Sequence, residues 1–217
     1  METKQRVVVT GRGVISPIGS SISDYWESLR MGVSGVRKII EFDPTGSACQ
    51  IAGIVTDFDS DAHFNLREKK SYERFTQFGL AAAFQAAEEA ELQELEGDSG
   101  EIGVIMGTGV GGITSYAKAY DALFAGPEER PIDAYTIPRI MNSAVSSAIA
   151  ISLGLRGPNF TLNTACSSGG NAVDSRRANT CCYLRWYRGS RHLRTSSRLG
   201  CIRCTLTQTQ RNSRNCL

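Results

Sequence analysis

The segment Asn159-Phe160-Thr161-Leu162-Asn163-Thr164-Ala165-Cys166-Ser167-Ser168-Gly169-Gly170 is the most informative part of this 217-residue chain. Residues 160–163 have the pattern of a short extended strand, and only small residues surround Cys166 after it. A strand that turns abruptly into a helix exposes the side chain at the bend, and only small neighbours tolerate the crowding there. The segment therefore predicts a strand, a tight turn that carries Cys166, and a helix.

Cys166 has two interpretations. The free N–H groups at the start of the following helix favour a thiolate, and a thiolate can accept an acyl group as a thioester. Alternatively, Cys166 is a buried structural cysteine. Its spacing in the sequence does not decide between a nucleophile and a structural residue.

Strand and helix patterns alternate before this segment. Short apolar or β-branched runs at residues 6–10, 50–55 and 102–106 predict strands, the first closed by a turn at Gly11-Arg12-Gly13. Helices are expected from a cap at Ser23 to Gly32, and over residues 71–92, 115–124 and 138–153. This alternation predicts an α/β fold with a largely parallel or mixed sheet.

Residues 107–112 are rich in glycine and follow a predicted strand. They lack a clean G-x-G-x-x-G helix start followed by an acidic residue about 20 positions later, and they lack the lysine of a phosphate-binding loop. We therefore favour a tight strand-to-helix crossing, where glycine permits close approach of two backbones, over a nucleotide site.

The composition divides the chain near residue 173. Residues 174–217 hold ten arginines, no lysine, five of the seven cysteines and one acidic residue, Asp174. Residues 1–173 hold 14 basic and 21 acidic side chains, a net charge of −7. An acidic surface of this kind is a poor nucleic-acid binder, so nucleic acid is not an expected partner.

Three further classes are disfavoured. The chain has no run of 18 apolar residues, so a membrane-spanning helix is not expected. Residues 1–6 are polar and lead directly into residues 7–9, which leaves no room for a signal peptide. Only Cys49 and Cys166 lie in the first 173 residues, which suits a reducing cytoplasm better than a disulfide scaffold.

The segment Asn163-Thr164-Ala165-Cys166-Ser167-Ser168-Gly169 resembles the active-site signature of the β-ketoacyl-acyl carrier protein synthases, and the chain most resembles the elongating type II enzymes. The resemblance covers residues 6–173. Further motifs in family order are Val7-Val8-Val9-Thr10-Gly11-Arg12-Gly13 with Pro17-Ile18-Gly19, Phe75-Thr76-Gln77-Phe78-Gly79-Leu80-Ala81, residues 107–112, Ile137-Pro138 and Gly154-Leu155-Arg156-Gly157-Pro158.

The resemblance implies a thiolase-like α/β fold, of which this chain holds the N-terminal half, and a homodimer. It implies an acyltransferase of fatty acid or polyketide synthesis that needs no cofactor and no metal. Cys166 would take an acyl group from acyl carrier protein. Malonyl-acyl carrier protein would then lose CO2, and its carbanion would attack the Cys166 thioester to form a β-ketoacyl product.

Other site residues also follow from the resemblance. Val110 matches a position that lines the acyl pocket, and the segment at Ile137 and Pro138 contributes to the pocket across the dimer. Arg67 and Lys70 match basic positions that meet the acidic carrier, which such cations would steer. The alternative for Arg67 and Lys70, with Lys69 and Arg74, is a solvated helix face.

The chain departs from the family in one important respect. The family takes two histidines, a lysine and a glycine-flanked phenylalanine from its second half. His63 and His192, the two histidines of this chain, match no family position. Without that base and oxyanion hole, we expect acyl transfer to Cys166 but no condensation. The alternative is a non-catalytic fragment that binds carrier protein or nucleic acid.

The tail, residues 174–217, has three interpretations. Cys201 and Cys204 form a C-x-x-C pair, but Cys181 and Cys182 are adjacent and so poorly spaced for zinc. An arginine-rich arm could stack bases on its aromatic residues, Tyr183, Trp186 and Tyr187. The third is a frameshift: a one-nucleotide shift across residues 185–189 permits Gly-Gly-Thr-Glu-Ala, a family motif. We therefore divide the chain into an incomplete synthase domain, residues 1–173, and a frameshifted or disordered tail.

Overall fold

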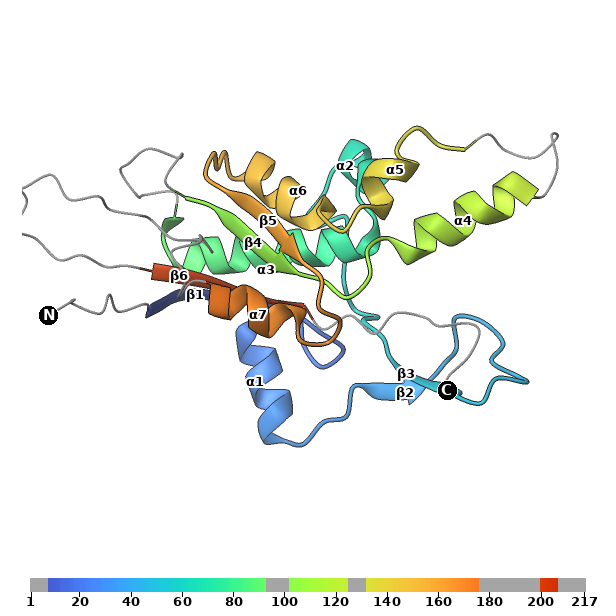
Figure 1. The fold of residues 1–217 in the computed structure, drawn as a ribbon. Coiled ribbons are helices and arrows are strands. Elements are labelled where there is room, and N and C mark those ends of the chain that lie inside the picture. The colour runs from blue at the N-terminus through green and yellow to red at the C-terminus, as the bar shows by residue number, and fades with distance from the viewer. Residues whose placement is uncertain (1–7, 93–101, 125–131, 176–199, 207–217) are drawn as a thin grey trace, which may run out of the picture.

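Helix α3 (Arg74–Glu89) lies at the centre of the molecule, and eleven of its sixteen residues are buried. The computed structural model describes residues 8–92, 102–124, 132–175 and 200–206 (Figure 1). The other helices of these ranges are α1 (Ile22–Arg30), α2 (Leu66–Ser71), α4 (Ile113–Phe124), α5 (Thr136–Ile140), α6 (Ala144–Ser152) and α7 (Ser168–Asp174). The strands are β1 (Val8–Ile15), β2 (Val36–Lys38), β3 (Ile51–Gly53), β4 (Val104–Gly107), β5 (Asn159–Leu162) and β6 (Gly200–Leu206).

The strands pair in twos within the described ranges. The pairs β1–β6 and β4–β5 are parallel, whereas β2–β3 is antiparallel. Helices and strands are interspersed along the chain from β1 to α7. The predicted α/β class with mixed strand directions is therefore confirmed.

Strand β1 runs straight through the expected turn at Gly11-Arg12-Gly13, so that prediction was wrong. The cause lies in helix α3. A Cβ atom on Gly11 would stand 2.0 Å from the carbonyl oxygen of Ala86, and one on Gly13 would stand 1.8 Å from that of Ala82. These glycines are needed because the strand and helix backbones touch, and not because the chain turns.

One edge of β1 is closed by side chains of α3. The backbone N–H of Arg12 donates to Glu89 Oε2 at 2.5 Å, and that of Val14 donates to Gln85 Oε1 at 3.0 Å. Residues two apart in a strand present their N–H groups to the same edge. The Arg12 guanidinium also bonds the Glu89 carboxylate, which lowers the pKa of Glu89. Helix α3 therefore supplies acceptors where a neighbouring strand would otherwise supply them.

Strand β4 is buried on both faces, as its continuous apolar run predicted. Val104 and Met106 belong to the main core with α3 and α6, whereas Ile105 packs with Ala172 of α7 and Leu162. Successive strand residues point to opposite faces. Strand β4 thus lies between two helical layers, with α7 on one side.

The helix expected over residues 71–92 is shorter, and this is a correction: it is α3, which begins at Arg74, because Ser71 is the last residue of a separate helix, α2. Tyr72 and Glu73 are both extended between them. The Glu73 carboxylate accepts the backbone N–H groups of Thr114 at 3.1 Å and Ser115 at 3.2 Å. The break therefore places an acidic side chain on the free N–H groups at the start of α4, where it is electrostatically favoured.

The helix expected over residues 138–153 is also divided, into α5 and α6. Met141 is extended at the break, with φ −60° and ψ 135°. The carbonyl of Ile140, at the end of α5, accepts the N–H of Gly112 at 3.1 Å. The end of α5 is therefore bonded to the glycine stretch and does not continue into α6.

Boundaries elsewhere are close to those expected. Helix α1 is capped by Ser21, whose side chain accepts the Asp24 N–H at 3.1 Å, rather than by Ser23. Gly32 follows its end with φ +67°, as a helix-terminating glycine does.

The tail contains a strand, although its sequence shows no strand periodicity. Strand β6 pairs with β1 from Val8 opposite Gly200 to Ile15 opposite Leu206, with a register shift between Val9 and Gly11. Helix α7 crosses the proposed boundary at residue 173 by one residue. The zinc, base-stacking and frameshift hypotheses concern Cys181, Cys182, residues 183–189, and the side chains of Cys201 and Cys204, all outside what the structure describes.

We predict that Gly13→Ala lowers the free energy of unfolding by about 3 kcal/mol, because its methyl group must displace the Ala82 carbonyl. Gly170→Ala is the matched control, since nothing lies within 4 Å of its added Cβ and alanine favours a helix. Urea unfolding followed by circular dichroism measures both variants. Equal stabilities of the two variants would contradict the close packing of β1 on α3.

Candidate active site

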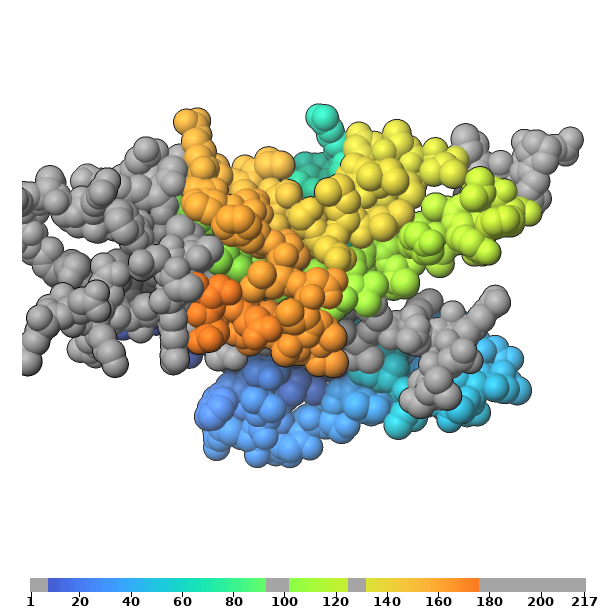
Figure 2. All heavy atoms as spheres, viewed as in Figure 1, coloured from blue at the N-terminus to red at the C-terminus, as the bar shows by residue number. Residues whose placement is uncertain are grey.

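Cys166 lies between β5 and α7, at the turn that the sequence predicted. Strand β5 ends at Leu162 and α7 begins at Ser168. The Cys166 thiol is free and its residue is exposed, so the interpretation as a buried structural cysteine was wrong. Figure 2 shows the orange segment that contains β5 and α7 at the surface of the molecule, beside the yellow segment of α5.

The backbone before Cys166 is in an uncommon conformation. Ala165 has φ +53°, in the left-handed region that residues with a Cβ seldom occupy. Such conformations persist where the surrounding structure holds them, and they often occur at functional sites. The sharp bend at Ala165 leaves the next side chain, Cys166, at the outside of the turn.

Hydrogen bonds around Thr164 hold this bend. Its N–H donates to Ser168 Oγ at 2.8 Å, and its carbonyl accepts from Ser167 Oγ at 2.7 Å. Its own hydroxyl oxygen accepts from Asn171 Nδ2 at 2.7 Å. Ser168 Oγ also lies 2.6 Å from the carbonyl of Ala165. Both flanks of Cys166 are therefore tied to the first turn of α7.

The glycine stretch, residues 107–112, packs against the turn that carries Cys166. A Cβ on Gly107 would lie 2.3 Å from the backbone of Ser168, and one on Gly112 would lie 2.1 Å from the carbonyl oxygen of Arg139. Ser168 Oγ lies 3.1 Å from the carbonyl of Thr108. The favoured interpretation, a crossing where glycine permits close backbone approach, is confirmed.

This stretch also brings the predicted pocket residues to the same part of the molecule. The stretch contacts the Cys166 turn at Gly107 and α5 at Gly112, and Val110 lies between these two glycines. Val110 is 49% exposed and Ile137 is 68% exposed, and Pro138 is exposed as well. All three apolar residues are therefore exposed in the described structure.

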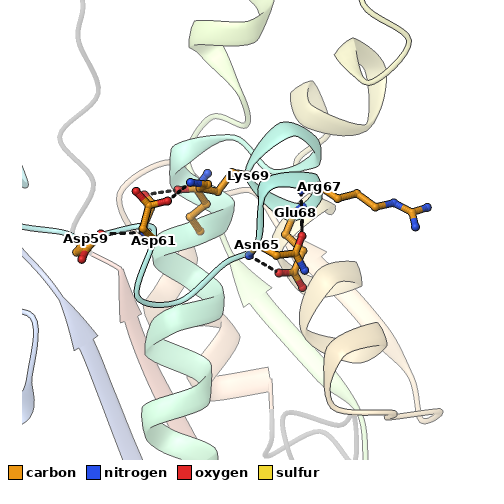
Figure 3. A network of polar contacts seen from close by, with 8 residues as sticks. Asp59, Asp61, Asn65, Arg67, Glu68 and Lys69 are labelled. Carbon is orange, nitrogen blue, oxygen red and sulfur yellow. Dashed lines mark hydrogen bonds and ion pairs between the residues drawn. The ribbon is translucent and has the colours of Figure 1, made fainter.

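Arg67 and Lys70 lie on α2, away from this turn along the chain, and both are exposed. Figure 3 shows the Arg67 side chain extended away from α2, whereas Lys69 turns toward Asp61, with which it forms an ion pair. The helix begins with a reciprocal cap: Asn65 Oδ1 accepts the Glu68 N–H at 3.0 Å, and Glu68 Oε2 accepts the Asn65 N–H at 2.9 Å.

His63 is not part of this site. The ring of His63 stacks on that of Phe58, with centroids 5.2 Å apart, in the loop before α2. His192 lies outside the described residues. Within the described ranges, no group of three or more His, Cys, Asp or Glu side chains could hold a metal ion.

Sequence reasoning missed three residues of this region: Glu73, Arg139 and the supporting role of Ser168. Glu73 and Arg139 act on elements far away in the sequence, so no local pattern marks them. Ser168 carried a signal, because its place in the quoted motif, two residues after Cys166, is the first position of a helix.

A family model described as "Beta-ketoacyl synthase, N-terminal domain" matches residues 4–179. The chain belongs to the β-ketoacyl synthase family. Relatives of this chain include two proteins named 3-oxoacyl-[acyl-carrier-protein] synthase 2. That of Synechocystis sp. is 39% identical over 78% of this chain and 41% of its own length. That of Coxiella burnetii is 40% identical over 76% of this chain and 40% of its own length.

Solved structures agree with this family. The ishigamide ketosynthase/chain length factor is 31% identical with a TM-score of 0.67, over 82% of this chain and 46% of that chain. A β-ketoacyl synthase from Burkholderia phymatum has the same fold at 22% identity, with a TM-score of 0.68 over 81% of this chain and 43% of that chain. The predicted fold, the N-terminal half of a thiolase-like synthase, is therefore confirmed.

The chain spans about 40% of the length of the curated relatives that it matches. In the part of the chain that the structure describes, no helix is both long and apolar enough to cross a membrane.

We predict that Ser168→Ala lowers the free energy of unfolding by about 1–3 kcal/mol. Ser168 is 2% exposed, and its loss leaves the Thr164 N–H without its acceptor. The control is Ser147→Ala on α6, an exposed position, for which we expect a change within about 0.5 kcal/mol. Urea unfolding measures both, and an unchanged stability for Ser168→Ala would show that the Thr164 network does not hold the turn.

Proposed function

We propose that this chain carries out the acyl-accepting half-reaction of a β-ketoacyl synthase, with Cys166 as the nucleophile and an acyl carrier protein as the donor. The observation that carries the proposal is the exposed Cys166 thiol on a bend held by the left-handed Ala165 and the hydrogen bonds of Thr164. A nucleophile needs this combination of access and fixed position.

The chemical step is a thioester exchange. The Cys166 sulfur attacks the carbonyl carbon of the carrier-bound thioester, and a new C–S bond forms. The bond between that carbon and the carrier's sulfur breaks, and the carrier leaves as its free thiol with the proton from Cys166. The acyl group then remains on the protein as a thioester, ready for a condensation step.

The surroundings of Cys166 suit an acyl chain. Val110, Ile137 and Pro138 present apolar surface that is exposed in the described structure, next to the glycine stretch that supports the turn. An acyl chain would be stabilised by covering this surface, by about 25 cal/mol for each Å² removed from water. We assign Val110 to the acyl pocket beside Cys166 of its own chain, and Ile137 and Pro138 to the pocket across the homodimer.

The carrier would dock on α2. Arg67 and Lys70 are exposed cations on one short helix of a domain with a net charge of −7. Such an arrangement steers an acidic partner to one place. Carrier use is supported by the names of the relatives, 3-oxoacyl-[acyl-carrier-protein] synthase 2, and by a structural neighbour described as a type II acyl-carrier protein in complex with its ketosynthase.

A second copy of the chain would cover the exposed apolar surface of α4 and α5. Helix α4 has no buried residue, and Tyr116, Tyr120, Leu123 and Phe124 are each more than half exposed. Figure 1 shows α4 projecting away from the centre of the molecule. An apolar surface of this kind marks an interface, so we assign this side of the molecule to a homodimer.

Condensation would need groups beyond those of this chain. The full reaction joins the Cys166 acyl group to malonyl-acyl carrier protein with loss of CO2, and it needs a general acid or base and an oxyanion hole. His63 stacks on Phe58 and lies outside the site. We therefore expect the 217-residue chain to accept an acyl group without releasing CO2 from malonyl-acyl carrier protein.

Incubation with an acyl-acyl carrier protein should add one acyl group to the chain, on Cys166. The intact mass measures the addition, and peptide mapping locates it. We expect Cys166→Ser to abolish the thioester and Cys49→Ser to retain it, because Cys49 lies in a loop before β3. Carrier binding without acyl transfer would instead support the non-catalytic binding fragment.

The double variant Arg67→Glu, Lys70→Glu should raise the carrier concentration that gives half the maximal acylation rate, by about tenfold. Reversing two charges repels an acidic carrier but leaves Cys166 untouched. Arg37→Glu, Lys38→Glu on β2 is the matched control, because both residues are exposed on another element. An equal effect of the two double variants would show that net charge, and not α2, attracts the carrier.

A further inference from the structure

Arg139 connects α2, which the proposed function assigns to carrier docking, with α5, which it assigns to the acyl pocket. It lies on α5, next to Pro138 and two residues after Ile137, yet its side chain is only 19% exposed. Its Nη2 donates to the backbone carbonyl of Lys70 on α2. Figure 1 shows α2 and α5 side by side, in agreement with this bond.

The bond to Lys70 closes the C-terminal end of α2. The last carbonyls of a helix have no partner within the helix and carry a partial negative charge, so a cation there is favourable. Helix α2 has six residues, too few to be stable without its surroundings. Its N-terminus is held by the Asn65–Glu68 cap, and its C-terminus is held by Arg139.

The guanidinium is itself fixed from the α5 side. Its Nη1 donates to Asp133 Oδ2 at 2.8 Å, and its Cζ lies 5.7 Å from the centre of the Tyr135 ring. Asp133 Oδ1 also accepts the Tyr135 N–H at 2.9 Å. Hydrogen bonds from Tyr135 and Arg139 lower the pKa of Asp133, so its carboxylate is charged at neutral pH.

The backbone of Arg139 extends the connection toward Cys166. Its carbonyl lies against Gly112, at the end of the glycine stretch, and the other end of that stretch packs on Ser168 at the Cys166 turn. A planar guanidinium can hold two acceptors at once in a fixed geometry, which a flexible ammonium cannot do. Within the described ranges, the hydrogen bond from Arg139 to Lys70 therefore links α2 to the pocket segment.

We propose that Arg139 is a positioning residue for carrier-dependent acyl transfer: it holds the carrier-docking helix α2 against the pocket segment α5, so that a docked carrier presents its thioester to Cys166. This inference rests on the proposed function. It assigns to Arg139 a role in placing the donor, and no role in the chemistry of Cys166 or in attracting the carrier.

The test compares two donors of the same acyl group, an acyl-acyl carrier protein and the small N-acetylcysteamine thioester, on the full chain. Arg139→Met should lower the saturating acylation rate with the carrier donor by about 10- to 100-fold, because a small misplacement of reacting groups costs that much. The carrier concentration that gives half the maximal rate, and the rate with the small donor, should each stay within about twofold of the wild-type values. Arg37→Met is the matched control and should change neither rate.

A second variant guards against loss of folding. Asp133→Asn keeps the Arg139 guanidinium, which can still bond the Lys70 carbonyl of α2, but removes its anionic partner. We therefore expect a smaller loss of rate with the carrier donor and no loss with the small donor. Circular dichroism confirms that each variant is folded. Arg139→Lys should restore only part of the carrier-dependent rate, because an ammonium group does not span both acceptors.

The outcomes separate the two proposals. A wild-type chain that neither donor acylates overturns the proposed function and this inference with it. The inference alone is overturned if the wild-type chain is acylated and the folded Arg139→Met and Asp133→Asn variants react with the carrier donor at the wild-type rate. An equal loss with both donors also overturns it, because a merely structural role would slow Cys166 toward any donor.

Discussion

Direct contact between backbones at glycine is the constraint on which the rest of this structure depends. Strand β1 lies so close to α3 that a Cβ at Gly11 or Gly13 would overlap the carbonyls of Ala86 and Ala82. The alanines of α3 serve the same purpose from the other side, because small side chains let the helix approach the strand. Had either surface been bulkier, β1 would have moved away from α3 and from the acceptors Gln85 and Glu89 that close its edge.

The same kind of contact builds the site. Gly107 at the end of β4 lies against Ser168, and Gly112 lies against Arg139, so one glycine stretch touches both the Cys166 turn and α5. Close backbone packing fixes relative positions more firmly than contact between long side chains, because few rotatable bonds intervene. The exposed Cys166 thus lies on closely packed backbone, as the acyl-accepting role that we propose for it requires.

Long-range polar contacts complete this arrangement at the helix ends. Glu73 places its carboxylate on the first N–H groups of α4, and Arg139 places its guanidinium on the last carbonyls of α2. Each charge has the sign that the helix end favours. Short helices such as α2 and α5 therefore keep their positions through partners on other elements, and those positions decide where a carrier and an acyl chain would lie.

The sequence by itself determined the α/β class, the buried strand β4, the turn at Cys166 and the family, since these depend on local patterns and on one motif. It also led to the correct interpretation of residues 107–112, because the features of a nucleotide loop are absent from that segment. Only the tertiary structure decided that Gly11 and Gly13 lie within a strand, that the helix expected over residues 138–153 is divided, and that Arg139 joins α2 to α5. The reason is physical. Each of these features depends on a backbone or a charged group far away in the sequence, and such a contact produces no periodic pattern in the neighbouring residues.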